Sequence, residues 1–373
     1  MPHKRTAPIT CKYSKSEQLY LILLCKPERK MQHTITTSAD GSSTLQLTQF
    51  GEAYHSTNGA YTEAMHIYIQ CGLEHLYQKL LHTLQNSGNE FRHAGYNTGN
   101  TPIPSLVRIN IFDVGFGTGL NCILVWAWQQ QLRQKGLPYP RIHYCGIEKY
   151  PIPLPEIEQL NYHTIIAQHT SLLPDNLSEV FHFMHKCPWE ENLAVPGIPE
   201  MPISGNKSTS ECSTTETNTH LGHTCTPECS PTETNAHSGN KSTSECSANC
   251  GNLFTVHSCR EDDFILHKSC ADIAVLGTDY YREKCYGEES KSRCCTIDTA
   301  TAVIFYDTFS PSTQPELWDE AIFRNIAAGC SPGSILVTYC SKGAVKQALR
   351  NTGFTLERLA GPPGKRHILR GTI

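Results

Sequence analysis

The stretch Val107-Arg-Ile-Asn-Ile-Phe-Asp113-Val-Gly115-Phe-Gly117-Thr118-Gly119-Leu-Asn121 decides the fold. Its first seven residues indicate a short buried strand ending in an acid, and the apolar residues of 120–135 have helical spacing. The glycines between them let the backbone turn tightly and approach a ligand without an intervening Cβ. Dehydrogenases hold a pyrophosphate with G-x-G-x-x-G, whereas this chain has G-x-G-x-G two residues after an acid. That pattern suits a ligand with an amino-acid group and a ribose better than a diphosphate.

Similar strands recur after this stretch. The segments that we expect to be strands are 141–148, 263–268, 301–307 and 334–339, and helices are expected over 314–328 and 343–351. Alternation of strands and helices predicts an α/β fold with a doubly wound, mostly parallel sheet. Glu148, Asp272 and Asp307 stand at or just after strand ends, so we expect them to meet in one crevice.

A tandem repeat of 17 residues interrupts this pattern, with copies beginning at Gly205, Gly222 and Gly239. Leu221 is the one large apolar residue of the first two copies, so the repeats cannot bury a core. We therefore predict a disordered insertion over 193–256. Residues 31–192 and 257–373 then form a single domain, and 1–30 are a disordered extension or precede the true start at Met31.

Composition and charge exclude several classes of protein. The chain has 373 residues, 39% of them hydrophobic, and a net charge of −4, which excludes a uniformly basic nucleic-acid coat. The apolar run 19–25 is too short to span a membrane, and charged residues follow it where a signal peptide would have small ones. We expect a cytoplasmic protein without membrane association. The 18 cysteines show no zinc-type C-x2-C pairs in the repeats, so reduced thiols and no metal are expected.

The glycine stretch resembles motif I of the class I S-adenosylmethionine (SAM) methyltransferases. Further stretches carry a closer resemblance: Phe50–Ser56, Gly59–Glu63, His66–Leu73, Gly115–Asn121, Ile147–Pro151, Asp307–Trp318, Thr338–Gly343 and Gly361–Arg366. Together they are similar to the methyltransferase domain of the tRNA 5-methylaminomethyl-2-thiouridine biosynthesis protein family, over nearly all of 40–192 and 257–373. The sequence departs from that family in the insertion, in the first thirty residues and in lacking the FAD-dependent oxidase domain of the bifunctional members. We read it as a stand-alone methyltransferase, with a separate FAD-dependent oxidase acting in the same pathway.

The resemblance implies a reaction, a cofactor and a set of site residues. The reaction is N-methylation of 5-aminomethyl-(2-thio)uridine at the tRNA wobble position, with SAM as donor and S-adenosylhomocysteine as product. Glu148 matches the acid that binds the ribose hydroxyls, and Asp272 matches the acid that contacts the adenine amine. The cofactor-binding residues are Gly115, Gly117, Thr118, Gly119, Asn121, Glu148, Lys149 and Asp272. Asp307 matches the catalytic acid, which orients the amine and takes its proton; capping of the next helix is the structural alternative.

Positive charge is concentrated in residues 341–373, which hold seven basic side chains and one acidic one. We expect this segment to contact tRNA phosphates. Phe309 is expected to form an apolar wall near the methyl group, and Tyr339 to stack on an extruded base. The substrate-binding residues are Phe309, Tyr339, Lys342, Lys365 and Arg366.

Two alternatives stay open at this stage. One is a class I SAM methyltransferase that acts on another amine, in a small molecule or a protein. The other is a non-catalytic scaffold with this fold, in which the repeat insertion is the functional part. Asp307 discriminates between them, because a scaffold has no need for an acid between Tyr306 and the following Phe-Ser-Pro turn.

Overall fold

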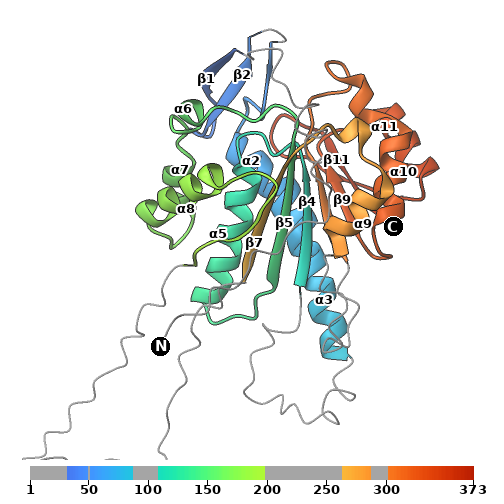
Figure 1. Ribbon diagram of the computed structural model, residues 1–373, viewed down its shortest axis with the longest axis horizontal. Helices are drawn as coiled ribbons and strands as arrows, with labels where there is room; N and C mark the ends of the chain where they lie inside the picture. The colour runs from blue at the N-terminus through green and yellow to red at the C-terminus, as the bar shows by residue number, and fades with distance from the viewer. Residues whose placement is uncertain (1–31, 49–50, 87–107, 198–262, 287–300) are drawn as a thin grey trace, which may run out of the picture. The chain divides into compact units, whose positions relative to one another are not determined.

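The computed structural model describes residues 32–48, 51–86, 108–197, 263–286 and 301–373 (Figure 1). The predicted extension 1–30 lies outside the described residues, as does most of the predicted insertion. In these ranges, no helix combines the length and apolar character that crossing a bilayer requires. Nor do the described residues bring together three His, Cys, Asp or Glu side chains that could hold a metal ion.

An eight-stranded sheet forms the centre of the fold. Its strands, in spatial order, are β10 (Thr355–Ala360), β11 (His367–Thr372), β9 (Ile335–Thr338), β8 (Ala302–Tyr306), β4 (Arg108–Val114), β5 (Arg141–Glu148), β7 (Phe264–Cys270) and β6 (Asn192–Ala194). The five strands from β9 to β7 are parallel, and β6, β10 and β11 pair antiparallel at the two edges. The predicted α/β class and the five predicted strands are confirmed.

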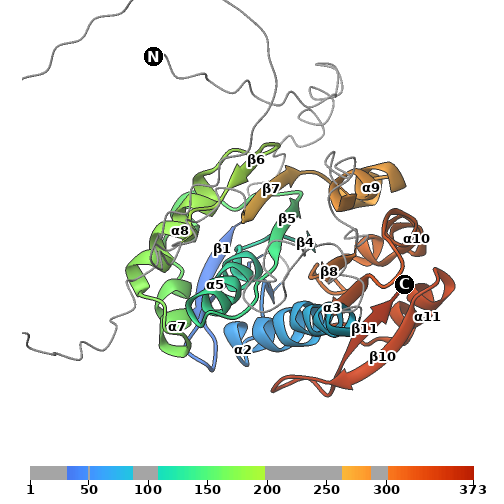
Figure 2. The ribbon, with the colours of Figure 1, turned by 90° about the horizontal axis from the view of Figure 1, so that it is seen from below.

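Both faces of the sheet are buried, because alternate side chains of each strand enter different cores. On β4, Ile111 packs into one core and Phe112 into the other. The first core is covered by α2 (Ala60–Ala64), η1 (Met65–Glu74), α3 (His75–Asn86), α5 (Leu120–Gln134), α6 (Leu154–Ile157), α7 (Tyr162–His169) and α8 (Pro174–Lys186). The second is covered by α9 (Thr278–Tyr286), α10 (Glu320–Gly329) and α11 (Gly343–Asn351) (Figure 2).

Two expected boundaries differ from the structure. The single helix expected over 314–328 is a 3₁₀ turn, η5 (Pro315–Trp318), followed by α10. Asp319 separates them, because its backbone is extended and its side chain accepts a hydrogen bond from the Ala321 amide as an N-cap. At the insertion, the expected start at residue 193 falls inside β6, whose pairing with β7 makes it part of the sheet.

A second, smaller sheet was not expected from the sequence. Its antiparallel strands are β1 (His33–Thr37), β2 (Ser43–Leu47) and β3 (Glu52–Ala53). Asp40, in the β1–β2 turn, accepts hydrogen bonds from the backbone amide and the hydroxyl of Thr62 on α2, both at 2.8 Å. Burial raises the pKa of Asp40, but hydrogen bonds from Ser42, Thr62 and Ser38 outweigh it and lower the pKa to about 2. This carboxylate therefore fastens the small sheet to the helical layer.

Candidate active site

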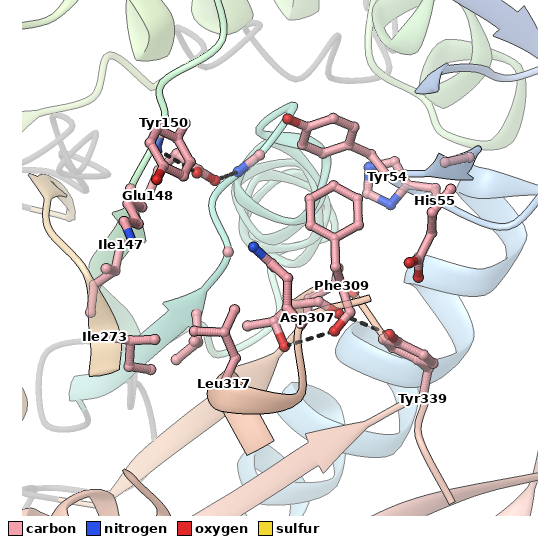
Figure 3. A pocket seen from close by; sticks show the side chains of 18 of the residues that line it. Tyr54, His55, Ile147, Glu148, Tyr150, Ile273, Asp307, Phe309, Leu317 and Tyr339 are labelled. Carbon is pink, nitrogen blue, oxygen red and sulfur yellow. Dashed lines mark hydrogen bonds between the residues drawn. The ribbon is translucent and has the colours of Figure 1, made fainter. Parts of the chain in front are cut away.

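A cavity of about 370 Å³ opens at the carboxyl ends of the parallel strands. It lies where β4 has β5 on one side and β8 on the other, which is the switch point at which doubly wound sheets bind ligands. The predicted residues that line it are Gly115, Gly117, Glu148, Lys149, Asp272, Asp307, Phe309, Tyr339 and Lys365. Figure 3 shows Ile147, Glu148 and Tyr150 on one side, and Tyr54, His55, Phe309 and Tyr339 on the other.

The glycine loop approaches the cavity as bare backbone. Gly115 has φ +97°, and a Cβ there would lie 2.5 Å from the carbonyl oxygen of Asp307. Gly117 has φ +48°, and a Cβ there would lie 3.1 Å from the ring of Tyr54. Both positions therefore require glycine, for conformation and for space. The acid of the motif, Asp113, is buried away from the cavity lining and accepts a hydrogen bond of 2.5 Å from the Tyr144 hydroxyl.

Glu148 presents a carboxylate at the end of β5. One of its oxygens accepts a hydrogen bond from the Gly117 amide at 3.0 Å, and the other accepts one from the Tyr150 amide at 2.9 Å. Burial raises its pKa, and the hydrogen bonds from the backbone amides of Tyr150, Gly117 and Lys149 oppose that rise. Two fixed acceptor oxygens suit a pair of neighbouring hydroxyls, as in a ribose.

Asp272 lies on the same side of the cavity. Its carboxylate accepts a hydrogen bond from the Ala274 amide at 3.0 Å, so it caps the 3₁₀ helix η3 (Ile273–Val275). It also pairs with Lys149 at 2.6 Å. Ile147 and Ile273 supply apolar surface beside these charges (Figure 3). Glycine backbone, a carboxylate with two fixed acceptor oxygens and apolar walls together fit SAM.

Three predicted cofactor residues lie behind the cavity rather than in its lining. Thr118 is buried, and its hydroxyl lies 2.8 Å from His55 Nε2 and accepts a hydrogen bond from Tyr162 at 2.9 Å. Gly119 is left-handed, with φ +72°, and starts α5. Asn121 donates from Nδ2 to Asp307 Oδ2 at 3.0 Å. These residues hold the loop and the carboxylate in place.

Asp307 follows β8 and lies half-buried in the wall of the cavity. Its backbone amide donates to the Val114 carbonyl at 3.0 Å, which fixes the residue beside the glycine loop. Burial raises the pKa of its carboxyl group, while the Tyr68 hydroxyl, the Asn121 amide and the positive charge of Lys365 lower it. A half-buried carboxylate that is oriented by an amide can accept a proton from a bound amine.

The loop after Asp307 is held by the small sheet. Glu52 of β3 accepts hydrogen bonds from the Ser310 amide at 2.9 Å and from the Thr313 hydroxyl. Phe309 packs edge-on against Tyr54, with ring centroids 5.0 Å apart. The small sheet thus sets the position of an aromatic wall of the cavity.

The predicted basic residues separate into two environments. Lys365 points into the cavity, with Nζ at 2.6 and 2.7 Å from the two carboxylate oxygens of Glu63 and 4.7 Å from the Tyr339 ring centre. Arg366 and Lys342 are exposed and do not line the cavity, and Lys342 donates to the Ser312 hydroxyl at 2.6 Å. The sequence had led us to expect Lys365 on an open basic surface. The structure instead places it in the cavity.

Sequence reasoning missed many residues of the cavity lining, among them Glu52, Tyr54, His55 and Glu63. Burial lowers the pKa of His55 to about 4, with Glu63 opposing and Lys365 adding to the shift. His55 is thus a neutral ring near pH 7. The sequence signal for these residues was their place in the stretches Phe50–Ser56 and Gly59–Glu63, which supported a family resemblance but not a role.

Comparison with known proteins finds a family match in the C-terminal part of the chain. Residues 267–373 match the model of a family described as S-adenosyl-L-methionine-dependent methyltransferase. The C-terminal part of the chain is thus similar to SAM-dependent methyltransferases. The resemblance seen in the sequence is confirmed, and the methyltransferase has its strand-end carboxylates in one cavity.

Several curated relatives carry one name, tRNA 5-methylaminomethyl-2-thiouridine biosynthesis bifunctional protein MnmC. The protein of Burkholderia multivorans is 21% identical over 346 residues, which is 92% of this chain and 35% of that protein. The protein of Chromobacterium violaceum is 36% identical over 77 residues, or 21% of this chain and 12% of that protein. The methyltransferase therefore spans about a third or less of the length of these relatives. A solved structure, MNMC2 from Aquifex aeolicus, is 17% identical with a TM-score of 0.47, covering 97% of this chain and 78% of that one.

Proposed function

We propose that this methyltransferase transfers a methyl group from SAM to the amine of 5-aminomethyl-(2-thio)uridine at the wobble position of tRNA. The products are the methylaminomethyl nucleoside and S-adenosylhomocysteine. The observation that carries the proposal is the half-buried Asp307 carboxylate, which lines the cavity beside the glycine loop and is oriented by Asn121. The names of the relatives support the choice of tRNA and of this nucleoside.

The cofactor half of the cavity would hold SAM, which supplies a methyl group on a positively charged sulfur. Gly115 and Gly117 would cradle its amino-acid part, Glu148 would bind the ribose hydroxyls, and Asp272 would accept from the adenine amine. Lys149 would keep the Asp272 carboxylate in place through their ion pair. Thr118, Gly119 and Asn121 would support this half from behind.

The substrate half would hold the modified base. Asp307 would accept a hydrogen bond from the amine, direct the nitrogen lone pair toward the methyl group and receive the proton released. Phe309 and Tyr339 would enclose the base and exclude water. Tyr339 is fixed for this role, because its hydroxyl donates to the Thr308 carbonyl at 2.9 Å.

Basic side chains outside the cavity lining would contact tRNA phosphates. Three of them are exposed (Lys342, Arg358 and Arg366), and Lys346 is partly exposed. Lys342 and Lys346 lie on or next to α11, and Arg358 and Arg366 lie on the β10–β11 hairpin. Burial, Arg358, Arg366 and Lys346 lower the pKa of His367, so these cations lie close enough to act together. A clustered positive surface is what binding to a phosphate backbone requires. A cytoplasmic location and a separate FAD-dependent oxidase in the same pathway belong to this proposal.

The test is methylation of tRNA that carries 5-aminomethyluridine, with purified protein and isotopically labelled SAM. Mass spectrometry of the digested nucleosides should show the methylaminomethyl form. Matched tRNA with unmodified uridine is the control and should stay unlabelled. Label found only in a small amine or a protein would refute the tRNA assignment and favour the alternative substrates.

A further inference from the structure

Lys365 is held inside the cavity by two different partners. Both oxygens of the Glu63 carboxylate lie within 2.7 Å of its ammonium, and the Tyr339 ring lies beneath it at 4.7 Å. Glu63 is only 7% exposed, so this ion pair is shielded from water on its acidic side. Such a carboxylate and aromatic face fix an ammonium far better than an exposed ion pair does.

The hairpin backbone is built to direct this lysine inward. A Cβ on Gly361 would lie 2.2 Å from the Lys365 carbonyl oxygen, and one on Gly364 would lie 2.1 Å from the Asn58 side chain. Gly364 also has φ +84°, which favours glycine. The tight turn places Lys365 in the cavity and leaves its neighbour Arg366 exposed.

The substrate half of the cavity carries several negative charges, which a cation would balance. Its lining includes the carboxylates of Glu52, Glu63 and Asp307, all of which favour a protonated amine. Among the described residues that line the cavity, the other cation is Lys149, which pairs with Asp272 in the cofactor half. Lys365 thus supplies the positive charge that offsets the carboxylates of the substrate half.

An alkylamine is mostly protonated near neutral pH, and an ammonium has no lone pair with which to attack a methyl group. We propose that Lys365, fixed by Glu63 and Tyr339, disfavours protonation of the substrate amine in the cavity, so that it reacts as the neutral base. This inference rests on the proposed function and adds a positioning residue to it. A neighbouring cation is a general means of keeping an amine neutral.

The groups that face Lys365 come from several elements. Glu63 of α2 opposes its effect, Tyr339 after β9 holds it, and Asp307 after β8 and His55 after β3 respond to its charge. The pKa of both Asp307 and His55 is lowered by Lys365. A substrate amine held by Asp307 would lie in the same positive field.

The atoms balance without a further reactant. The substrate ammonium first loses its proton to water. The amine nitrogen then forms a bond to the methyl carbon as the carbon–sulfur bond breaks, and S-adenosylhomocysteine leaves. The new secondary ammonium passes its proton to Asp307 or to water.

The experiment compares single-turnover methyl transfer by the parent and by Lys365→Met across the pH range in which a primary amine titrates. The rate should rise with pH as the amine becomes neutral. At an effective dielectric constant near 20, loss of one charge about 6–10 Å away should move this rise upward by about one to two pH units. The variant should be about ten- to hundredfold slower below the rise and reach the parental rate above it.

Two variants control for charge and for folding. Lys365→Arg keeps the charge and should keep the parental pH profile. Lys186→Met removes an exposed charge at the end of α8, far in sequence from the site, and should also keep the parental pH profile. Thermal melting and SAM affinity, measured by calorimetry, establish that each variant is folded. If Lys365→Met is not folded, Lys365→Gln provides the neutral side chain.

The outcomes separate this inference from the function on which it rests. A neutral variant that is slower by the same factor at every pH, or one with an unshifted rise, would refute the electrostatic role. Parent protein that transfers no methyl group to the aminomethyluridine tRNA would refute the proposed function, and the inference with it.

Discussion

Replacement of Asp307 by asparagine removes a charge and little else. Asn121 donates to Asp307 Oδ2 at 3.0 Å, while its own Oδ1 is buried and has no hydrogen-bond partner among the described residues. Rotation of the Asn121 amide by half a turn would offer that oxygen to the new side-chain amide. Asp307→Asn should therefore keep the loop geometry.

The size of the effect follows from the environment of the carboxylate. Burial disfavours the charged form of Asp307, so a neutral replacement removes a desolvation penalty and should leave the free energy of unfolding unchanged within about 1 kcal/mol. Methyl transfer should fall by roughly 10²–10⁴-fold, the usual contribution of a positioned acid–base group. SAM affinity should stay at the parental value.

The assay is single-turnover methylation at saturating SAM and tRNA, with calorimetry for SAM binding and thermal melting for stability. Asn121→Ala is the matched variant, because it leaves the carboxylate but removes its orienting bond, worth about 1 kcal/mol or roughly a fivefold loss of rate. An Asp307→Asn protein that is folded, binds SAM and retains more than a tenth of the parental rate would refute the assigned role.

Three further predictions test other parts of the structure. Glu148→Ala should weaken SAM binding by about 1.5–3 kcal/mol, since it removes a charged acceptor; unchanged affinity in calorimetry would contradict the cofactor site. Arg358→Ala combined with Arg366→Ala should weaken tRNA binding and flatten the slope of log affinity against log salt by about 0.9 for each lost phosphate contact; a parental slope would place the tRNA surface elsewhere. Asp40→Asn should lower the melting temperature near neutral pH. The folded pKa of Asp40, about 2, lies below its ordinary 3.8, so its contribution is present above pH 3.8, fades as the pH falls toward 2, and the two proteins should then melt alike.

Local patterns were sufficient to predict the central sheet and the acids at its edge. Apolar runs such as 301–307 identify buried strands, and the parallel arrangement then brings Glu148, Asp272 and Asp307 together without further information. The same reasoning failed at 314–328, where Asp319 caps a new helix although its apolar neighbours keep helical spacing.

Residues that act across long sequence distances escaped prediction. Glu52 contacts Ser310, 258 residues away, from a strand of two residues that has no apolar pattern of its own. Lys365 and Arg366 are adjacent cations in the sequence, and only the turn geometry shows that one is enclosed and the other exposed. Asn121 was assigned to the cofactor because a glycine loop precedes it, whereas its side chain donates a hydrogen bond to the Asp307 carboxylate.

The Glu63–Lys365 contact joins residues that are 302 positions apart in the sequence. During synthesis, the two halves of the cavity can therefore form at different times. The glycine loop, Glu148 and Asp272 are all made well before the β10–β11 hairpin, so a growing chain can assemble the cofactor half first. The substrate half has to wait for the hairpin, because its lysine is supplied from there. Until then the Glu63 carboxylate lacks its cation, and contacts of such long range form slowly. A nascent chain would therefore acquire cofactor binding before it acquires a complete pocket for the amine.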